Sequence, residues 1–358
     1  MERRAPRPPG LYPKSPELPY PTLRKSLEMM RTALASAAAI VFLLSPSIAQ
    51  ETPSAAPNAT FRSSSSLVLV PVVALRNGLP DKTLIREDFQ ISDNGHPVPI
   101  TTFDSSAQFS TRPLALWFIV QCNMPDWQKQ GSGLFQGQIA RFKPALSDLD
   151  KQDSVAVAHW CDDGQSNLDL LPTKNIEQLT STLEQVLSQP LAPNDHGRPG
   201  ELALQKTLQL IIDQTRSLVP EPIPVLIFLY GDYSAMPKSE ADHFIDALLE
   251  TSAVAYGLKD RRSPRLWIPG EQAEVANYIA AETGGQYSRV TPDTYAQGLK
   301  QILDQLHSRY ELGFKPESLD GKRHKLTVEL TQAAKKQHKG VRLRYRVAYV
   351  PIQRSHSD

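Results

Sequence analysis

The sequence has few cysteines, no excess of charge of either sign and no paired-cysteine spacing typical of a zinc site. Its 358 residues include 2 cysteines. The 39 basic and 38 acidic residues give a net charge of +1, so no bulk field attracts nucleic acid or an anionic membrane. The class of partner therefore has to be inferred from local sites, and nucleic acid is not expected.

Enzyme motifs are also missing. There is no HExxH sequence and no phosphate-binding glycine loop with a lysine. The segment GDYSA around Ser234 lacks the second glycine of a nucleophile elbow. His159 and Cys161 are two residues apart on a predicted strand, but a catalytic pair also needs a third group that orients the base. We predict a protein that is not an enzyme, with a cell-envelope hydrolase using Cys161 or Ser234 as an alternative.

Residues 1–49 are predicted to be a leader and a cleaved signal peptide. Basic residues precede an apolar run at 33–44, and the small-residue pattern Ser47-Ile48-Ala49 follows it, which predicts cleavage after Ala49. The run is shorter than the roughly 20 residues of a membrane span, so an uncleaved anchor is the alternative. We expect translation to start at Met29 or Met30. Export would place the protein in the periplasm, in the cell envelope or outside the cell, with no membrane span after cleavage.

Beyond the leader, the sequence divides into four segments. Residues 50–66 are a polar linker without periodicity. Alternating apolar residues and Asn-Gly turns predict strands before and after a central α/β region. The predicted segments are a β segment at 67–110, an α/β domain at 111–307 and a second β segment at 308–352. We expect the two β segments to pair into one small β-sandwich-like module, because neither can cover its own apolar face.

The central region alternates short apolar runs with amphipathic stretches. We expect buried strands at 114–120 and 224–230. We also expect one helix capped by Ser239 and another at 271–283 that ends at Gly284-Gly285. Alternation of this kind implies an α/β fold with a doubly wound, mostly parallel sheet. Ligands of such sheets lie beyond the C-terminal ends of the strands.

Several stretches together resemble the von Willebrand factor type A domain, and more closely the related proteins abundant in acidobacteria. They are LVLVPVVAL and LIREDFQISDNGHPVPITTF before the domain, RPLALWFIV and LSDLDKQDSVAVAHWCDDG within it, and YELGFKPESLDGKRHKLTVEL with VRLRYRVAYVP after it. The resemblance implies an exported α/β domain that binds proteins through a metal-ion-dependent adhesion site.

The resemblance also implies where the ion would bind. The family supplies oxygen ligands from Asp-x-Ser-x-Ser after the first strand, a Thr on a later loop and an Asp after the fourth strand. In this sequence the positions after the first strand align with Gln121, Asn123 and Pro125, which offer neutral oxygens or no side-chain ligand. The two later positions fall near the carboxylates of Glu201 and Asp232. We predict a degenerate site with no metal, a weak divalent cation being the alternative. Trp127 and Trp160 are candidates for recognition, and the alternative is that both are core or rim residues without a partner. The binding-loop positions are Gln121, Asn123, Pro125, Asp126, Trp127, Glu201 and Asp232.

The two cysteines follow the first and second predicted strands of the sheet. If those strands are neighbours, Cys122 and Cys161 come within reach of a disulfide. We hypothesise that they are bonded, with two independent thiols as the alternative.

The histidines and arginines near the C-terminus have polar neighbours in the sequence. We expect His307, His324 and His338 to be solvated. The alternating Arg342, Arg344 and Arg346 are expected to form the exposed face of a strand.

These observations predict an exported, non-catalytic protein-interaction or scaffolding protein without a cofactor, acting on an unidentified protein partner. A metal-dependent adhesion protein using Mg²⁺ or Ca²⁺ is the first alternative and the cell-envelope hydrolase is the second. Passive structural filling of an envelope complex is a third.

Overall fold

The structure is a computed structural model of mixed α/β type with several sheets. It describes residues 67–105, 113–121, 139, 141–147, 149–161, 164–187, 198–218, 222–230, 235–261 and 272–351. These residues belong to one compact unit. The predicted leader, signal peptide and linker lie outside the described residues. Within the described ranges, no helix is long and apolar enough to cross a membrane.

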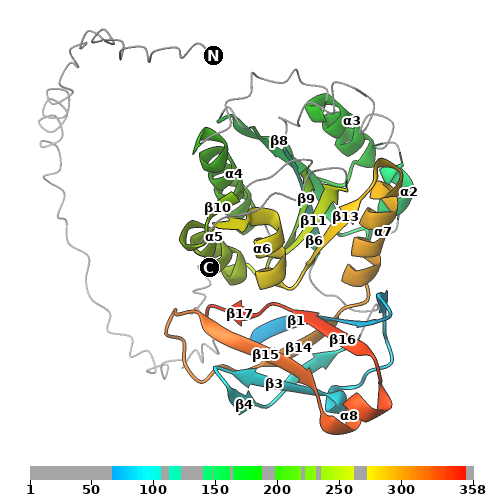
Figure 1. Cartoon of the computed structure of the whole chain (residues 1–358), viewed down its shortest axis with the longest axis vertical. Coiled ribbons are helices and arrows are strands. Elements are labelled where there is room, and N and C mark those ends of the chain that lie inside the picture. Colours follow the sequence, from blue (N-terminus) through cyan, green and yellow to red (C-terminus); the bar gives the residue numbers. More distant parts are fainter. Residues whose placement is uncertain are drawn as a thin grey trace, which may run out of the picture. The chain divides into compact units, whose positions relative to one another are not determined.

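A six-stranded sheet forms the centre of the predicted α/β region (Figure 1). In spatial order its strands are β13 (Gln286–Val290), β11 (Val254–Asp260), β9 (Ile223–Tyr230), β6 (Leu114–Gln121), β7 (Ser154–Trp160) and β8 (Ser166–Thr173). The first five run parallel to one another. The edge strand β8 runs antiparallel to β7, with a register shift between them. The sheet is therefore mixed.

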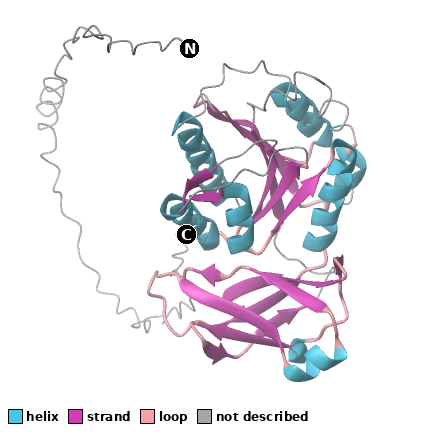
Figure 2. Ribbon diagram, viewed as in Figure 1, coloured by secondary structure: helices cyan, strands magenta, loops and turns pink. Residues whose placement is uncertain are grey.

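Helices cover both faces of this sheet, as Figure 2 shows. One apolar core joins the sheet to α2 (Phe142–Leu146), α3 (Ile176–Leu187) and α7 (Tyr295–Leu306). The other joins it to α4 (Arg198–Arg216), α5 (Lys238–Glu250) and α6 (Val275–Thr283). Strand β6 is buried along its whole length, with Leu116 and Phe118 in the first core and Trp117 and Ile119 in the second. A continuous apolar run fits this position because both faces of the strand are covered.

The helix ends follow the sequence only in part. Gly284 ends α6 in a left-handed conformation with φ 82°, as the Gly-Gly pair predicts. The predicted cap Ser239 was wrong, because it lies inside α5 and the N-cap is Pro237. The start of the predicted 271–283 helix was also wrong. Residues 272–274 form the strand β12 (Gln272–Glu274), which pairs with β10 (Ala235–Pro237).

The N-terminal and C-terminal strands pair with each other, as the sequence predicted. One sheet has the order β16 (Val341–Tyr345), β1 (Val68–Arg76), β14 (Tyr310–Phe314) and β5 (Thr102–Asp104), with β2 (Leu79–Pro80) beside β1. The other has the order β17 (Ala348–Tyr349), β15 (His324–Leu330), β3 (Phe89–Asp93) and β4 (His96–Val98). Both sheets contribute to one apolar core that includes Val72, Ile91, Leu312 and Val328. The short helices η1 (Arg86–Asp88) and α8 (Gln332–Gln337) complete this part, and η3 (Pro292–Thr294) precedes α7.

The chain after β16 packs closely against the end of α6. A Cβ atom added to Gly284 would lie 2.4 Å from the backbone carbon of Tyr345, so only glycine fits there. The expectation of an exposed arginine face was wrong for Arg346, which is 4% exposed. Its guanidinium donates to the carbonyl oxygens of Leu249 at 3.2 Å and Leu69 at 2.7 Å, because a buried guanidinium needs acceptors.

Candidate functional site

The C-terminal end of β6 is the place where the resemblance puts the first metal ligand. Gln121 is the last residue of this strand and is 1% exposed. By strand alternation it points to the face that carries Trp117 and Ile119. Its Oε1 and Nε2 are both shielded from solvent and have no hydrogen-bond partner among the described residues. A buried carboxamide in this state is costly, since each polar atom has lost water without a replacement.

The residue at this strand end does not fit a Mg²⁺ site. Mg²⁺ is bound through carboxylates and water, whereas Gln121 offers one neutral oxygen and no charge. Within the described ranges, the one group of three His, Cys, Asp or Glu side chains close enough to share an ion lies elsewhere. Gln121 by itself therefore supplies no charge to balance a dication.

Most of the other predicted positions of this loop lie outside the described residues. Asn123, Pro125, Asp126, Trp127 and Asp232 lie outside the described residues. Glu201 lies in α4, although its side chain is not described. The predicted binding loop therefore stays a prediction.

The second predicted tryptophan, Trp160, has a structural place. It is 4% exposed and belongs to the core between the sheet and α4. The structure therefore favours the alternative that Trp160 is a core residue over a place in a recognition surface.

Cys161 follows β7, the strand adjacent to β6, and takes part in a disulfide. Gln121 and Trp160 face each other in the register of the two strands, so the residues that follow them begin close together. Cys122, the second of the 2 cysteines in the sequence, lies outside the described residues. The pairing of Cys122 with Cys161 stays a prediction, but Cys161 has no free thiol.

His159 forms a buried pair with an aspartate of the neighbouring strand. Its Nδ1 lies 2.9 Å and 2.8 Å from the two carboxylate oxygens of Asp169 on β8. Asn167 donates to the same carboxylate at 3.1 Å. The histidine side chain is 7% exposed and that of Asp169 is 10% exposed. This pair joins β7 to the edge strand, and only the antiparallel register of β8 brings its members together.

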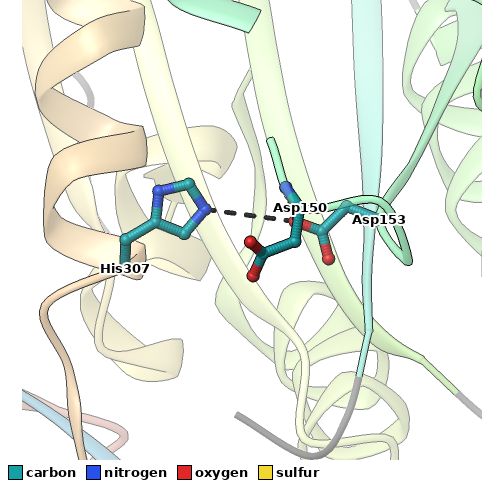
Figure 3. Close-up of side chains that lie close together, drawn as sticks. All are labelled: Asp150, Asp153 and His307. Atoms are coloured by element: carbon teal, nitrogen blue, oxygen red, sulfur yellow. Dashed lines mark hydrogen bonds and ion pairs between the residues drawn. The ribbon is translucent and has the colours of Figure 1, made fainter. Parts of the chain in front are cut away.

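A second cluster lies at the opposite end of the same strands. Asp150 and Asp153 occupy the turn before β7, and His307 is the C-cap residue of α7. Figure 3 shows the imidazole of His307 directed toward the two carboxylates. His307 Nε2 lies 4.0 Å from Asp153 Oδ2, and one ligand atom from each of the three residues falls within 4.8 Å of the others.

Asp153 has a structural role in this cluster. Its Oδ1 accepts from the backbone N–H of Leu114 at 2.7 Å, and its Oδ2 accepts from that of Asp150 at 3.2 Å. Asp153 thereby fixes the first residue of β6 to the turn before β7. The expectation of solvated histidines holds only in part for His307, whose side chain is 27% exposed while its Nε2 is shielded from solvent. The sequence did contain the acidic spacing DLDKQD, but nothing in it indicated that α7 would end there.

The other two C-terminal histidines are buried. His324 Nδ1 lies 3.0 Å from Asp93 Oδ1, and the Tyr349 hydroxyl donates to Asp93 Oδ2 at 2.7 Å. Burial, and then the adjacent Asp93, raise the pKa of Tyr349 above its usual value. His338 Nε2 lies 3.6 Å from Asp88 Oδ2. Both histidines therefore belong to internal polar networks of the β sheets, since a buried imidazole needs partners.

No family model and no curated protein matches the sequence. Among solved structures, a von Willebrand factor type A protein from Catenulispora acidiphila is similar over 81% of this chain and 76% of its own, with 10% identity and a TM-score of 0.40. Proximal thread matrix protein 1 from the mussel byssus matches 60% of this chain at 11% identity, with a TM-score of 0.39. The similarity spans 49% of that mussel chain. An aerotolerance-related membrane protein from Bacteroides fragilis matches 53% of this chain and 98% of its own at 12% identity, with a TM-score of 0.35.

Proposed function

We propose that the chain is an exported, non-catalytic protein whose α/β part serves protein interaction or scaffolding without an ion at the C-terminal end of its sheet. The proposal rests on the residue at the end of β6, Gln121. A neutral carboxamide stands where the resemblance expects the first carboxylate, and it is 1% exposed. A dication held there would lack the charge that balances it. Recognition is therefore assigned to shape and to the loop that carries Trp127.

Two side chains support a role other than catalysis. Cys161 is in a disulfide, and a disulfide sulfur is not a thiolate nucleophile. His159 Nδ1 lies 2.8 Å from Asp169 Oδ2, and this buried pair has a structural role because it joins β7 to the edge strand β8. The remaining candidate nucleophile of that alternative, Ser234, lies outside the described residues.

A thermal melt tests the absence of an ion. The full chain is melted with EDTA and then with millimolar Mg²⁺ or Ca²⁺. We expect no shift. An ion that binds only the folded state would add about 2.7 kcal/mol at 100 times its dissociation constant, and a saturable shift of that kind would replace the proposal with metal-dependent adhesion. The same melts on the His307→Gln variant separate the two ends of the sheet, because a shift that persists in that variant does not arise at His307.

A crosslinking experiment tests the interaction itself. A photo-crosslinking residue is placed at position 127 in the native host, with the same residue at the exposed His243 as the control. We expect one discrete crosslinked protein from position 127 and none from position 243. Equal labelling from both positions, or none from either, would refute a partner at this loop.

A further inference from the structure

The cluster of Asp150, Asp153 and His307 combines donors from two separate elements. The carboxylates come from the turn before β7, and the imidazole comes from the end of α7 (Figure 3). These elements are more than 150 residues apart in the sequence, so the cluster exists only in the folded chain. It lies at the N-terminal end of β6 and β7, away from the end where Gln121 lies.

An unpaired nitrogen distinguishes this cluster from a simple acidic turn. His307 Nε2 is shielded from solvent and has no hydrogen-bond partner in the described part of the chain. Its nearest carboxylate oxygen is Asp153 Oδ2 at 4.0 Å, which is too long for a hydrogen bond. A buried ring nitrogen without a partner is unfavourable by about 1–3 kcal/mol. A group placed between the nitrogen and the carboxylates would remove this cost.

We propose that Asp150, Asp153 and His307 form a binding site for a zinc-class dication. Two carboxylates supply the two negative charges that such an ion needs. The imidazole selects zinc and its neighbours in the transition series over Mg²⁺ and Ca²⁺, which prefer oxygen ligands. Three protein ligands and a water are a regular set for Zn²⁺.

The geometry needs little adjustment to accept the ion. Ligand bonds of about 2.0–2.2 Å at tetrahedral angles place two donors of one ion roughly 3.3–3.6 Å apart. The distance of 4.0 Å between His307 Nε2 and Asp153 Oδ2 would therefore shorten by a few tenths of an ångström when the ion binds. Asp150 is exposed, so its side chain is free to turn toward the other two. Asp153 is held from behind by the backbone N–H of Leu114 at 2.7 Å, the kind of outer contact that orients a metal ligand.

An ion at this position would have a structural effect. From His307 the chain continues to β14, which begins at Tyr310 and pairs with β1. The ion would tie the end of α7 to the start of β6 and β7 at the point where the chain leaves the central sheet. The site is independent of the interaction proposed for the loop at 127.

Zinc titration of the full chain tests the site. The protein is prepared without a histidine tag, treated with EDTA, dialysed and titrated with Zn²⁺ by calorimetry. We expect one zinc per chain. Asp150→Asn and His307→Gln should each weaken binding by at least about tenfold, since even outer contacts of metal ligands are worth roughly 10–100-fold. His243→Gln, which changes an exposed histidine on α5, should leave the affinity unchanged.

The design keeps the result interpretable. The carboxylate of Asp150 is exposed, so Asp150→Asn is expected to fold normally, and circular dichroism checks this. Cobalt provides a second measurement, because Co²⁺ in the site should give a visible absorption that saturates at one equivalent and is lost in Asp150→Asn. Absence of saturable zinc binding, equal affinity in the wild type and both site variants, or displacement of zinc by equimolar Mg²⁺ would each overturn the proposal.

Discussion

The two ends of β6 and β7 differ in the hydrogen bonding of their buried polar side chains. At the C-terminal end, where sheets of this type usually bind ligands, Gln121 is buried and neutral and has no partner in the described ranges. At the N-terminal end, Asp153 is also buried but is hydrogen-bonded by two backbone N–H groups. His307 and Asp150 lie beside it. The cluster of Asp150, Asp153 and His307 therefore lies at the end of the sheet where the topology does not favour ligand binding.

The largest expected effect lies at the C-terminal end and concerns the disulfide of Cys161. Cys161→Ser should lower the free energy of unfolding by about 2–4 kcal/mol, because the unfolded chain regains the freedom that the crosslink removes. Chemical denaturation measures the change. If Cys122 is the partner, Cys122→Ser and the double variant should lose the same amount, and a reductant should have no further effect on any of them. Additive losses in the double variant would contradict the pairing.

The next effect lies at the N-terminal end and tests the structural role of Asp153. With EDTA present, Asp153→Asn should lower the free energy of unfolding by about 1–3 kcal/mol, because an amide nitrogen replaces one of two acceptors that bind backbone N–H groups. Asp150→Asn is the matched control in the same turn, and it should change stability by no more than about 0.5 kcal/mol because its carboxylate is exposed. Urea denaturation of the two variants makes the comparison. Equal losses would mean that Asp153 does not hold β6 to the turn.

The smallest effect has the opposite sign and concerns Gln121. Gln121→Leu should leave stability unchanged or raise it by up to about 1 kcal/mol, because its carboxamide atoms have no hydrogen-bond partner to lose among the described residues. Gln305 is the matched control, since it is 5% exposed and its Nε2 donates to Gln286 Oε1 at 3.1 Å. Gln305→Leu should cost about 1–2 kcal/mol. A loss at Gln121 as large as that at Gln305 would show that its amide is bonded in solution.

Much of the fold was predictable because it depends on local patterns. The apolar run at 114–120 indicated a strand covered on both faces, and Gly284 indicated the end of α6. The cap at Ser239 and the start of the 271–283 helix were wrong because residues 272–274 pair with β10. A pairing between distant segments overrides local propensity when it satisfies the backbone.

The candidate sites were less predictable. Polar neighbours in the sequence suggested that His307, His324 and His338 are solvated, yet each lies against a carboxylate from a distant segment. Sequence proximity says little about burial for a residue at the end of a helix or strand, because the covering residues come from other parts of the chain.

By itself, the sequence determined the order of strands and helices, the pairing of the terminal strands and the neutral residue at position 121. These features follow from apolar periodicity and from the chemistry of single side chains, which act over a few residues. Only the tertiary structure decided that His307 faces Asp153 and that His159 binds Asp169 rather than Cys161. It also decided that Arg346 is buried against the carbonyl oxygens of Leu249 and Leu69. Those contacts depend on the register and packing of segments far apart in the chain, because buried polar atoms take whichever partner the fold places within reach.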